Sequence, residues 1–271
     1  MHRLTIRSWL IFLMTLLGTL PARAELIMSS APRDTREKEE ELYKPIVDLL
    51  SKAAGEQVTF RYGDNYLTYQ SEMRKGNYDI VLDGPQFVGW RMAKLGHVPL
   101  VKFPGNLVFV AITRRDRDAV RELKDLAGRT ICAFPSPNLA TLSVLYEFDN
   151  PARQPLILEI KNFPEVYKGV KSGRCVGGIL QAKLFQDLDK DANIAKVIFK
   201  SKPLPNQAFS ASPRLTAEKR VLVIRALLSP EGAVATQQLR EIYKVPALLP
   251  ATEEEYQGLG KLLRDVWGFD L

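Results

Sequence analysis

The chain has 271 residues, a formal net charge of +7, two cysteines and two histidines. One apolar core rarely serves a chain of this length, so two structural units are expected. Only His97 lies outside the first 24 residues, and one histidine with two cysteines argues against a zinc site and against histidine- or cysteine-dependent catalysis.

Residues 1–24 are predicted to be a cleaved signal peptide. They combine a basic start, the apolar run LIFLMTLLGTL and a small-x-small cleavage site at residues 22–24. A membrane anchor is the alternative, but the apolar run is shorter than the roughly 20 residues that span a bilayer. Cleavage removes three arginines and no acid, which lowers the formal charge from +7 to +4 and argues against a nucleic acid partner. The sequence therefore predicts a periplasmic protein that begins at Glu25.

From residue 25 onward, short apolar runs alternate with longer helical patterns, which is typical of a parallel sheet covered by helices. Strands are expected at 25–30, 57–63, 78–84, 97–103 and 106–115, and helices at 37–54, 66–75 and 85–95. Pro45 predicts a kink or a restart in the first helix, and Gly55 predicts its C-terminal cap.

The alternation begins again after Arg115. Further helices are expected at 121–128, 138–148, 164–173 and 182–188, strands at 130–134, 155–163, 175–180, 193–201 and 207–212, and three helical patterns end the chain. The predicted fold is α/β with two lobes, each a mostly parallel sheet flanked by helices. The first lobe comprises 25–107 completed by 208–271, and the second comprises 108–207. A ligand cleft between the lobes would close by hinge motion.

Five stretches, in this order, resemble the periplasmic solute-binding proteins of phosphate, phosphite and phosphonate importers: SSAPRD, YKPIVDLLSKAAG, YGDNYLTYQSEMRKGNYDIVLDGPQFVGW, ELKDLAGRTICAF and VKSGRCVGGIL. The most specific features are Tyr66, a helix ending at Gly76, a strand through Asp79 and the Gly84-Pro85 turn. The resemblance covers nearly all of residues 25–230. It implies a type II, transferrin-like binding fold and a receptor that presents a small solute to an ABC permease in the inner membrane.

Two strand-to-helix junctions are candidate ligand contacts, because ligands of doubly wound sheets bind at the carboxyl ends of strands, beside helix N-termini. They are residues 83–86 in the first lobe and 136–139 in the second. In the alternative interpretation, Asn138 only caps its helix and the prolines only shape the turn. The predicted ligand-binding residues are Tyr66, Asp83, Gly84, Pro85, Gln86, Ser136, Pro137, Asn138, Leu139, Thr141 and Gln181.

The second junction departs from the family pattern. Phosphonate-binding members carry a Ser-Thr-Ser-like cluster there, whereas this chain has Asn-Leu-Ala-Thr at 138–141, and a histidine of the following loop is replaced by Phe163 or Pro164. Both differences argue against a fully charged phosphonate as the ligand. The polar and aromatic candidates for the cleft are Tyr62, Tyr66, Phe87, Gln86 and Gln181, with Asp64 and Asp83 available to a cationic group.

Cys132 and Cys175 are predicted to form a disulfide. The chain is destined for an oxidising compartment, and right-handed connections would place strands 130–134 and 175–180 side by side. Two separate buried thiols are the alternative, because the register of the strands decides whether the Cα atoms come within roughly 7 Å.

Other classes of function are weighed against solute transport. An enzyme is disfavoured, because the sequence contains no Gly-x-Ser-x-Gly, His-Glu-x-x-His or Cys-x-x-Cys motif. A sensory protein that reports a solute to a membrane kinase is one alternative, and an interaction module that has lost its ligand is another. No metal, cofactor or nucleic acid is expected, and the protein is expected to be a monomer.

Overall fold

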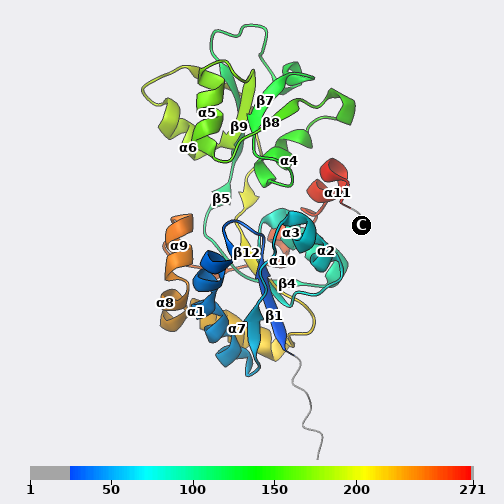
Figure 1. Cartoon of the computed structure of the whole chain (residues 1–271), viewed down its shortest axis with the longest axis vertical. Coiled ribbons are helices and arrows are strands. Elements are labelled where there is room, and N and C mark those ends of the chain that lie inside the picture. Colours follow the sequence, from blue (N-terminus) through cyan, green and yellow to red (C-terminus); the bar gives the residue numbers. More distant parts are fainter. Residues whose placement is uncertain (1–24, 270–271) are drawn as a thin grey trace, which may run out of the picture.

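The computed structural model describes residues 25–269, and the predicted signal peptide lies outside this range. The described residues form two main sheets, one above the other along the long axis of the molecule, and each is flanked by helices (Figure 1). The two sheets are linked by a small antiparallel pair, β5 (Asn106–Leu107) and β11 (Leu204–Pro205). This two-lobed α/β arrangement agrees with the predicted fold class.

The first sheet has the order β13-β4-β12-β3-β1-β2. Its strands are β1 (Leu26–Ser30), β2 (Val58–Phe60), β3 (Ile80–Asp83), β4 (Val98–Lys102), β12 (Ala208–Ala211) and β13 (Leu249–Pro250). Strands β1, β2 and β3 are parallel, whereas β12 runs antiparallel between β3 and β4. All four residues of β3 are buried, as expected for a central strand covered on both faces.

The helices around this sheet are α1 (Arg36–Ala54), α2 (Tyr66–Arg74), α3 (Pro85–Leu95), α7 (Ala217–Leu228), α8 (Pro230–Ala235), α9 (Gln237–Tyr243) and α10 (Glu253–Tyr256). Helix α1 runs unbroken through Pro45, so the predicted restart is wrong. The buried face on either side of the proline, which includes Tyr43, Ile46 and Leu50, holds the helix together despite one missing backbone hydrogen bond. Gly55 caps α1 in the left-handed conformation, as predicted.

The second sheet has the order β10-β6-β9-β7-β8. Its strands are β6 (Phe109–Arg114), β7 (Thr130–Ala133), β8 (Leu156–Glu159), β9 (Gly177–Gln181) and β10 (Ala195–Lys200), and its helices are α4 (Leu139–Leu145), α5 (Phe163–Lys171) and α6 (Ala182–Asp189). The predicted helix at 121–128 is a short 3₁₀ helix over Leu123–Leu126, and a second one covers Pro151–Arg153. The single strand predicted at 106–115 is divided at Val108, because β5 pairs with β11 while β6 pairs with β9.

The predicted disulfide between Cys132 and Cys175 is present, with a Cα–Cα distance of 5.6 Å. Strands β7 and β9 are parallel neighbours, and Cys132 lies opposite Gly178. Cys175 precedes β9 by two residues, so the bond joins β7 to the turn that follows α5. A Cβ atom at Gly169 would lie 2.4 Å from the Cys132 Sγ atom, which explains why a glycine faces the bridge.

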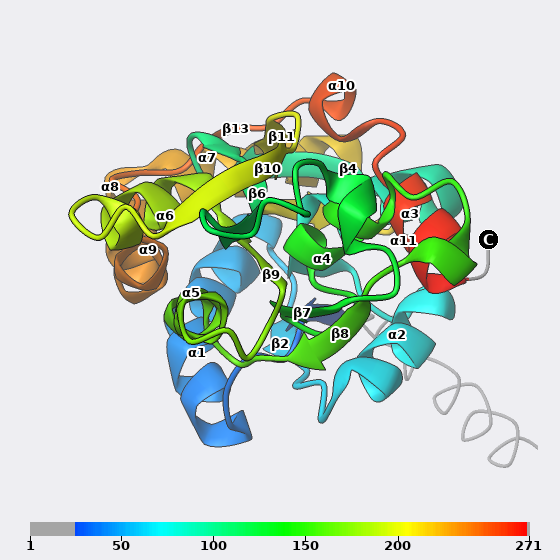
Figure 2. The same cartoon turned by 90° about the horizontal axis from the view of Figure 1, so that it is seen from above.

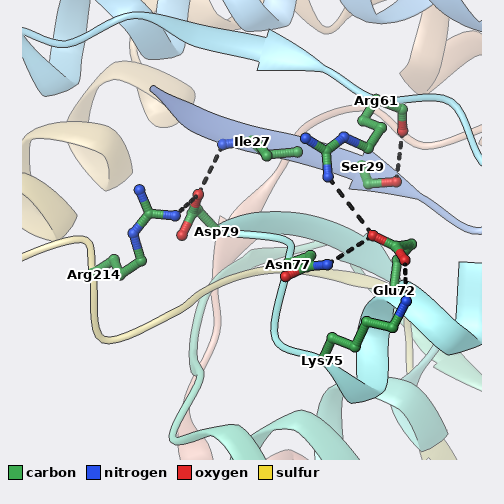
Figure 3. Close-up of polar contacts among 8 residues, drawn as sticks. All are labelled: Ile27, Ser29, Arg61, Glu72, Lys75, Asn77, Asp79 and Arg214. Carbon is green, nitrogen blue, oxygen red and sulfur yellow. Dashed lines mark hydrogen bonds and ion pairs between the residues drawn. The ribbon is translucent and has the colours of Figure 1, made fainter. Parts of the chain in front are cut away.

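The start of β1 is held by the buried carboxylate of Asp79 (Figure 3). Its Oδ2 atom accepts hydrogen bonds from the Ile27 backbone at 2.9 Å and from Arg214 Nη1 at 3.0 Å. Nearby, Glu72 of α2 accepts hydrogen bonds from Lys75 and Asn77. These contacts fix the end of the first sheet that lies opposite the carboxyl ends of β1 and β3.

The last helix, α11 (Lys261–Trp267), contacts both α3 and α4. Figure 2 shows it beside α3 at one side of the molecule. The Phe269 ring packs edge-on against Trp90 at 5.1 Å, and the Lys261 ammonium lies 5.1 Å from the centre of the Tyr146 ring. The end of the chain therefore connects the helices of the two sheets.

Candidate functional site

A cleft of about 410 Å³ lies between the two sheets, at the carboxyl ends of β1 and β3. Both β/α units contribute to its wall. The lining residues are Ala31, Pro32, Arg33, Tyr66, Gly84, Pro85, Gln86, Phe87, Leu107, Phe109, Phe134, Pro137, Asn138, Leu139, Phe163, Gln181 and Gln207. Eight of the eleven predicted ligand-binding residues are among them, so the sequence prediction and the cleft coincide in position.

The first junction is a tight connection from β3 into α3. Gly84 is extended and Pro85 occupies the first helical position, where its missing N–H is not needed. The backbone N–H groups of Phe87 and Val88 both donate to the Gly84 carbonyl, at 3.0 and 3.1 Å. A Cβ atom at Gly84 would lie 2.6 Å from Gln86 Oε1, so a glycine is required for this placement of the Gln86 side chain.

The second junction is capped by its own asparagine. The Asn138 side chain accepts a hydrogen bond from the Ala140 N–H at 3.0 Å, and the Asn138 N–H donates to the Pro135 carbonyl at 3.1 Å. The capping role weighed for Asn138 is therefore present, and the residue also lines the cleft.

The two junctions touch each other across the cleft. The Gln86 Nε2 atom donates a hydrogen bond to the Pro137 carbonyl at 3.2 Å, although the residues are 51 positions apart in the sequence. Gln86 is only 4 % exposed. The first turn of α3 and the loop before α4 are thus held face to face over the cavity.

Asp83 was predicted to contact the ligand, and the structure places it outside the cleft lining. Its side chain is fully buried and turns away from the cleft into the first lobe. Its carboxylate accepts hydrogen bonds from the Tyr69 hydroxyl at 2.6 Å and from Arg91 Nε at 2.9 Å. The side chain alternation of β3 places this residue on the face covered by α2 and α3, where Arg91 neutralises it.

Two residues of the second junction also lie outside the lining. Thr141 is fully buried, and its hydroxyl donates to the Phe134 carbonyl at 2.6 Å, so it holds the loop rather than a ligand. Ser136 does not line the cleft either. The structure therefore places both predicted residues outside the cleft lining.

Other candidates divide between the cleft and the surface. Tyr66 and Phe87 line the cavity, and Phe163 does so in preference to Pro164. Burial raises the pKa of the Tyr66 hydroxyl, while the positive charge of Arg33 opposes that shift. Tyr62 and Asp64 are outside the lining: the Tyr62 hydroxyl donates to the Asp34 carbonyl, and Asp64 pairs with Arg36.

Sequence reasoning missed Arg33, Gln207, Phe109 and Phe134. Arg33 follows β1 in the SSAPRD stretch, and applying the rule of strand carboxyl ends to the first strand would have identified it. Gln207 precedes the antiparallel strand β12, which carries no such signal. In the sequence, Phe109 and Phe134 have the pattern of ordinary core residues.

Within residues 25–269, no group of three or more histidine, cysteine or acidic residues is placed to hold a metal ion. The helices of this part of the chain also lack any segment with the length and apolar character needed to cross a bilayer. The site consists of aromatic, amide and guanidinium groups, which can bind and orient a small molecule.

The fold and the cleft define a two-lobed binding protein of the type II periplasmic class. Residues 28–256 match the family described as "ABC transporter, phosphonate, periplasmic substrate-binding protein", and the chain belongs to this family. The family consists of substrate-binding proteins of ABC transporters and not of enzymes. Family membership confirms the resemblance inferred from the sequence.

A curated relative, the phosphate-import protein PhnD of Mycolicibacterium smegmatis, is 28% identical over 130 residues. That match covers 45% of this chain and 39% of the relative, so it spans about two fifths of the relative's length.

Two solved structures show the same fold. A Xanthomonas citri protein bound to ATP has a TM-score of 0.70 and 13% identity, over 91% of this chain and 99% of that one. PhnD1 from Prochlorococcus marinus, in complex with methylphosphonate, has a TM-score of 0.63 and 12% identity, over 89% and 97% of the two chains.

Proposed function

We propose that the protein is a periplasmic binding protein that captures a small polar or anionic solute between its lobes and delivers it to an ABC permease. The observation that carries this proposal is the cleft of about 410 Å³, which is lined from both lobes and bridged by the Gln86–Pro137 hydrogen bond. Cavities of this size suit small molecules. The relatives bound to methylphosphonate and to ATP support a solute that carries negative charge.

The lobes are proposed to be 25–107 completed by 208–271, and 108–207. The paired β5 and β11 would form the hinge, because they are the two chain crossings between the main sheets. Residues 1–24 are proposed to direct export and to be removed. Isolation of the protein from the periplasm with Glu25 as its first residue tests this export proposal, and retention of residues 1–24 in a membrane fraction would contradict it.

The central experiment is a thermal unfolding screen of the mature protein against phosphonates, phosphite, phosphate, sulfonates, carboxylates and zwitterions. A solute at a hundredfold excess over its dissociation constant stabilises the folded form by about 2.7 kcal/mol. For a chain of this size that raises the melting temperature by roughly 5 to 10 °C. If no solute in the screen stabilises the protein, the proposal of a solute receptor is wrong.

The partner is proposed to be a permease that receives the protein as a monomer. A membrane kinase is the alternative partner. Cross-linking of the solute-loaded protein in cells, followed by identification of the captured membrane protein, distinguishes them, and a sedimentation measurement tests the monomer.

A further inference from the structure

The charge of the cleft is unusual for a receptor of multiply charged anions. Among its lining residues, Arg33 is the single charged side chain, and no lysine, histidine, aspartate or glutamate accompanies it. The Arg33 guanidinium lies 5.0 Å from the centre of the Tyr243 ring, and its positive charge also opposes the rise in the pKa of Glu39 that burial causes. A single positive charge in the lining can pair with one negative charge on a ligand.

Arg33 is held at the edge of the cleft by a buried carboxylate. Glu39 of α1 is 3 % exposed, and its Oε1 atom accepts hydrogen bonds from the backbone N–H groups of Arg33 at 2.7 Å and Asp34 at 3.2 Å. Its Oε2 atom accepts from the Ser30 hydroxyl at 3.3 Å. The loop after β1 therefore has a fixed backbone, and only the Arg33 side chain needs to adjust to a ligand.

Several of the backbone donors at the two junctions already have partners within the protein. At the first junction Pro85 has no N–H, and the N–H groups of Phe87 and Val88 donate to Gly84. At the second junction the Asn138 side chain takes the Ala140 N–H, and no serine or threonine hydroxyl lines the cleft. These particular groups are therefore not available to a phosphoryl group, which binds through several donors at once.

Two acceptors in the cleft wall lack partners. Among the described residues, the side chain oxygens of Gln86 and Gln207 are buried and make no hydrogen bond. An unpaired buried acceptor is unfavourable by about 1–3 kcal/mol, and a ligand that carries only acceptor oxygens leaves it unpaired. A ligand that carries a hydrogen-bond donor beside its anionic group would pair with one of these oxygens.

The remaining surface of the cavity is aromatic. Phe134 and Phe163 of the second lobe pack edge to face, with ring centroids 4.7 Å apart. They line the cleft together with Tyr66, Phe87 and Phe109. Aromatic walls of this kind contact a flat apolar group over a large area.

We infer that the solute is a singly charged organic anion with an aromatic or similarly flat apolar body, bound through Arg33 and packed against Phe134 and Phe163. This inference rests on the proposed function and narrows its ligand class. Arg33 is the one charged side chain of the lining and would pair with a single negative charge, and the phenylalanines provide the surface against which the flat body packs.

Four anions test separately how the charge of the ligand and its aromatic ring affect binding. They are benzenesulfonate, methanesulfonate, phenylphosphonate and methylphosphonate, measured by titration calorimetry at about pH 8, where phosphonates carry close to two charges. Benzenesulfonate is expected to bind at least tenfold more tightly than methanesulfonate and at least tenfold more tightly than phenylphosphonate. Phenylacetate, a carboxylate with the same ring, is expected to bind within about tenfold of benzenesulfonate.

Two variants test whether Arg33 contacts the ligand. Arg33→Gln is expected to weaken benzenesulfonate binding by about tenfold or more, because it removes the single charge of the wall. Arg36→Gln is the matched control, because Arg36 lies three residues away, pairs with Asp64 and does not line the cleft. It should leave the affinity within about twofold of the wild type, and both variants should unfold at the wild-type temperature.

The outcomes are distinct for the inference and for the proposed function. If methylphosphonate binds more tightly than benzenesulfonate, or if Arg33→Gln and Arg36→Gln behave alike, the inference is overturned while the receptor function stands. If neither benzenesulfonate nor phenylacetate binds but another class of the wider screen does, the inference alone also fails. If nothing in either panel binds, both fail.

Discussion

Replacing Asp83 with asparagine tests whether this residue serves the fold or the ligand. In the structure the carboxylate and Arg91 are both fully buried, and Arg91 Nη2 also donates to the Tyr69 hydroxyl at 2.9 Å. Asp83→Asn removes the negative charge and leaves the guanidinium buried without compensation. Breaking a buried pair in this way destabilises a protein by about 3–5 kcal/mol. The melting temperature should therefore fall by roughly 10 °C, and solute affinity should change by less than about threefold.

The assay combines urea unfolding with ligand titration on the same samples. A second variant, Arg91→Met, and the double variant complete a thermodynamic cycle, in which the double variant should be less destabilised than the sum of the two single ones by about 1–3 kcal/mol. The reasoning is refuted if Asp83→Asn keeps the wild-type stability and abolishes binding, because the carboxylate would then contact the ligand.

Three further predictions concern stability. The Cys132–Cys175 bond joins residues 43 positions apart, and its removal in the double serine variant should destabilise the protein by up to about 4 kcal/mol in urea unfolding. A reduced wild-type protein as stable as the oxidised one would contradict this. Burial, with Arg91 and Arg220 nearby, lowers the pKa of His97 to about 2, so the unfolded chain binds a proton below about pH 6.5 that the folded protein does not. Stability should therefore fall by about 2 kcal/mol from pH 7 to pH 5, and His97→Gln should remove this dependence. Gly178→Ala should destabilise by about 1–3 kcal/mol, since its Cβ would lie 2.7 Å from Val166 Cγ1, and an unchanged melting temperature would contradict that close packing.

The alternation of apolar runs and helical patterns was sufficient to predict the layered fold. The strands that carry the cleft, β1, β3 and β7, are short, apolar and bounded by glycine or proline, so their positions are visible in the sequence. The division at Val108 was not predictable, because it depends on which partner each half of the segment pairs with. The unbroken course of α1 through Pro45 depends likewise on burial against the sheet.

The position of the candidate site could be predicted from the sequence, but the side chain groups that face the cleft could not. Strand carboxyl ends pointed to residues 84–86 and 137–139, which do line the cleft. The direction of each side chain was not accessible, because Asp83 and Thr141 satisfy their polar atoms inside the lobes. The position of Gln207 in the lining likewise depends on contacts between distant segments.

The unpaired amide oxygens connect binding to closure of the lobes. When the lobes are apart, water can donate a hydrogen bond to the Gln86 side chain and to the Pro137 carbonyl. In the structure the Gln86–Pro137 bond is formed, and the Gln86 oxygen is buried without a partner among the described residues. If the lobes close over an empty cleft as proposed, an unpaired buried acceptor of this kind is unfavourable by about 1–3 kcal/mol. A solute that offers one hydrogen-bond donor as well as its negative charge removes this cost, so the same side chain favours closure over a suitable solute and opposes closure over an empty cleft.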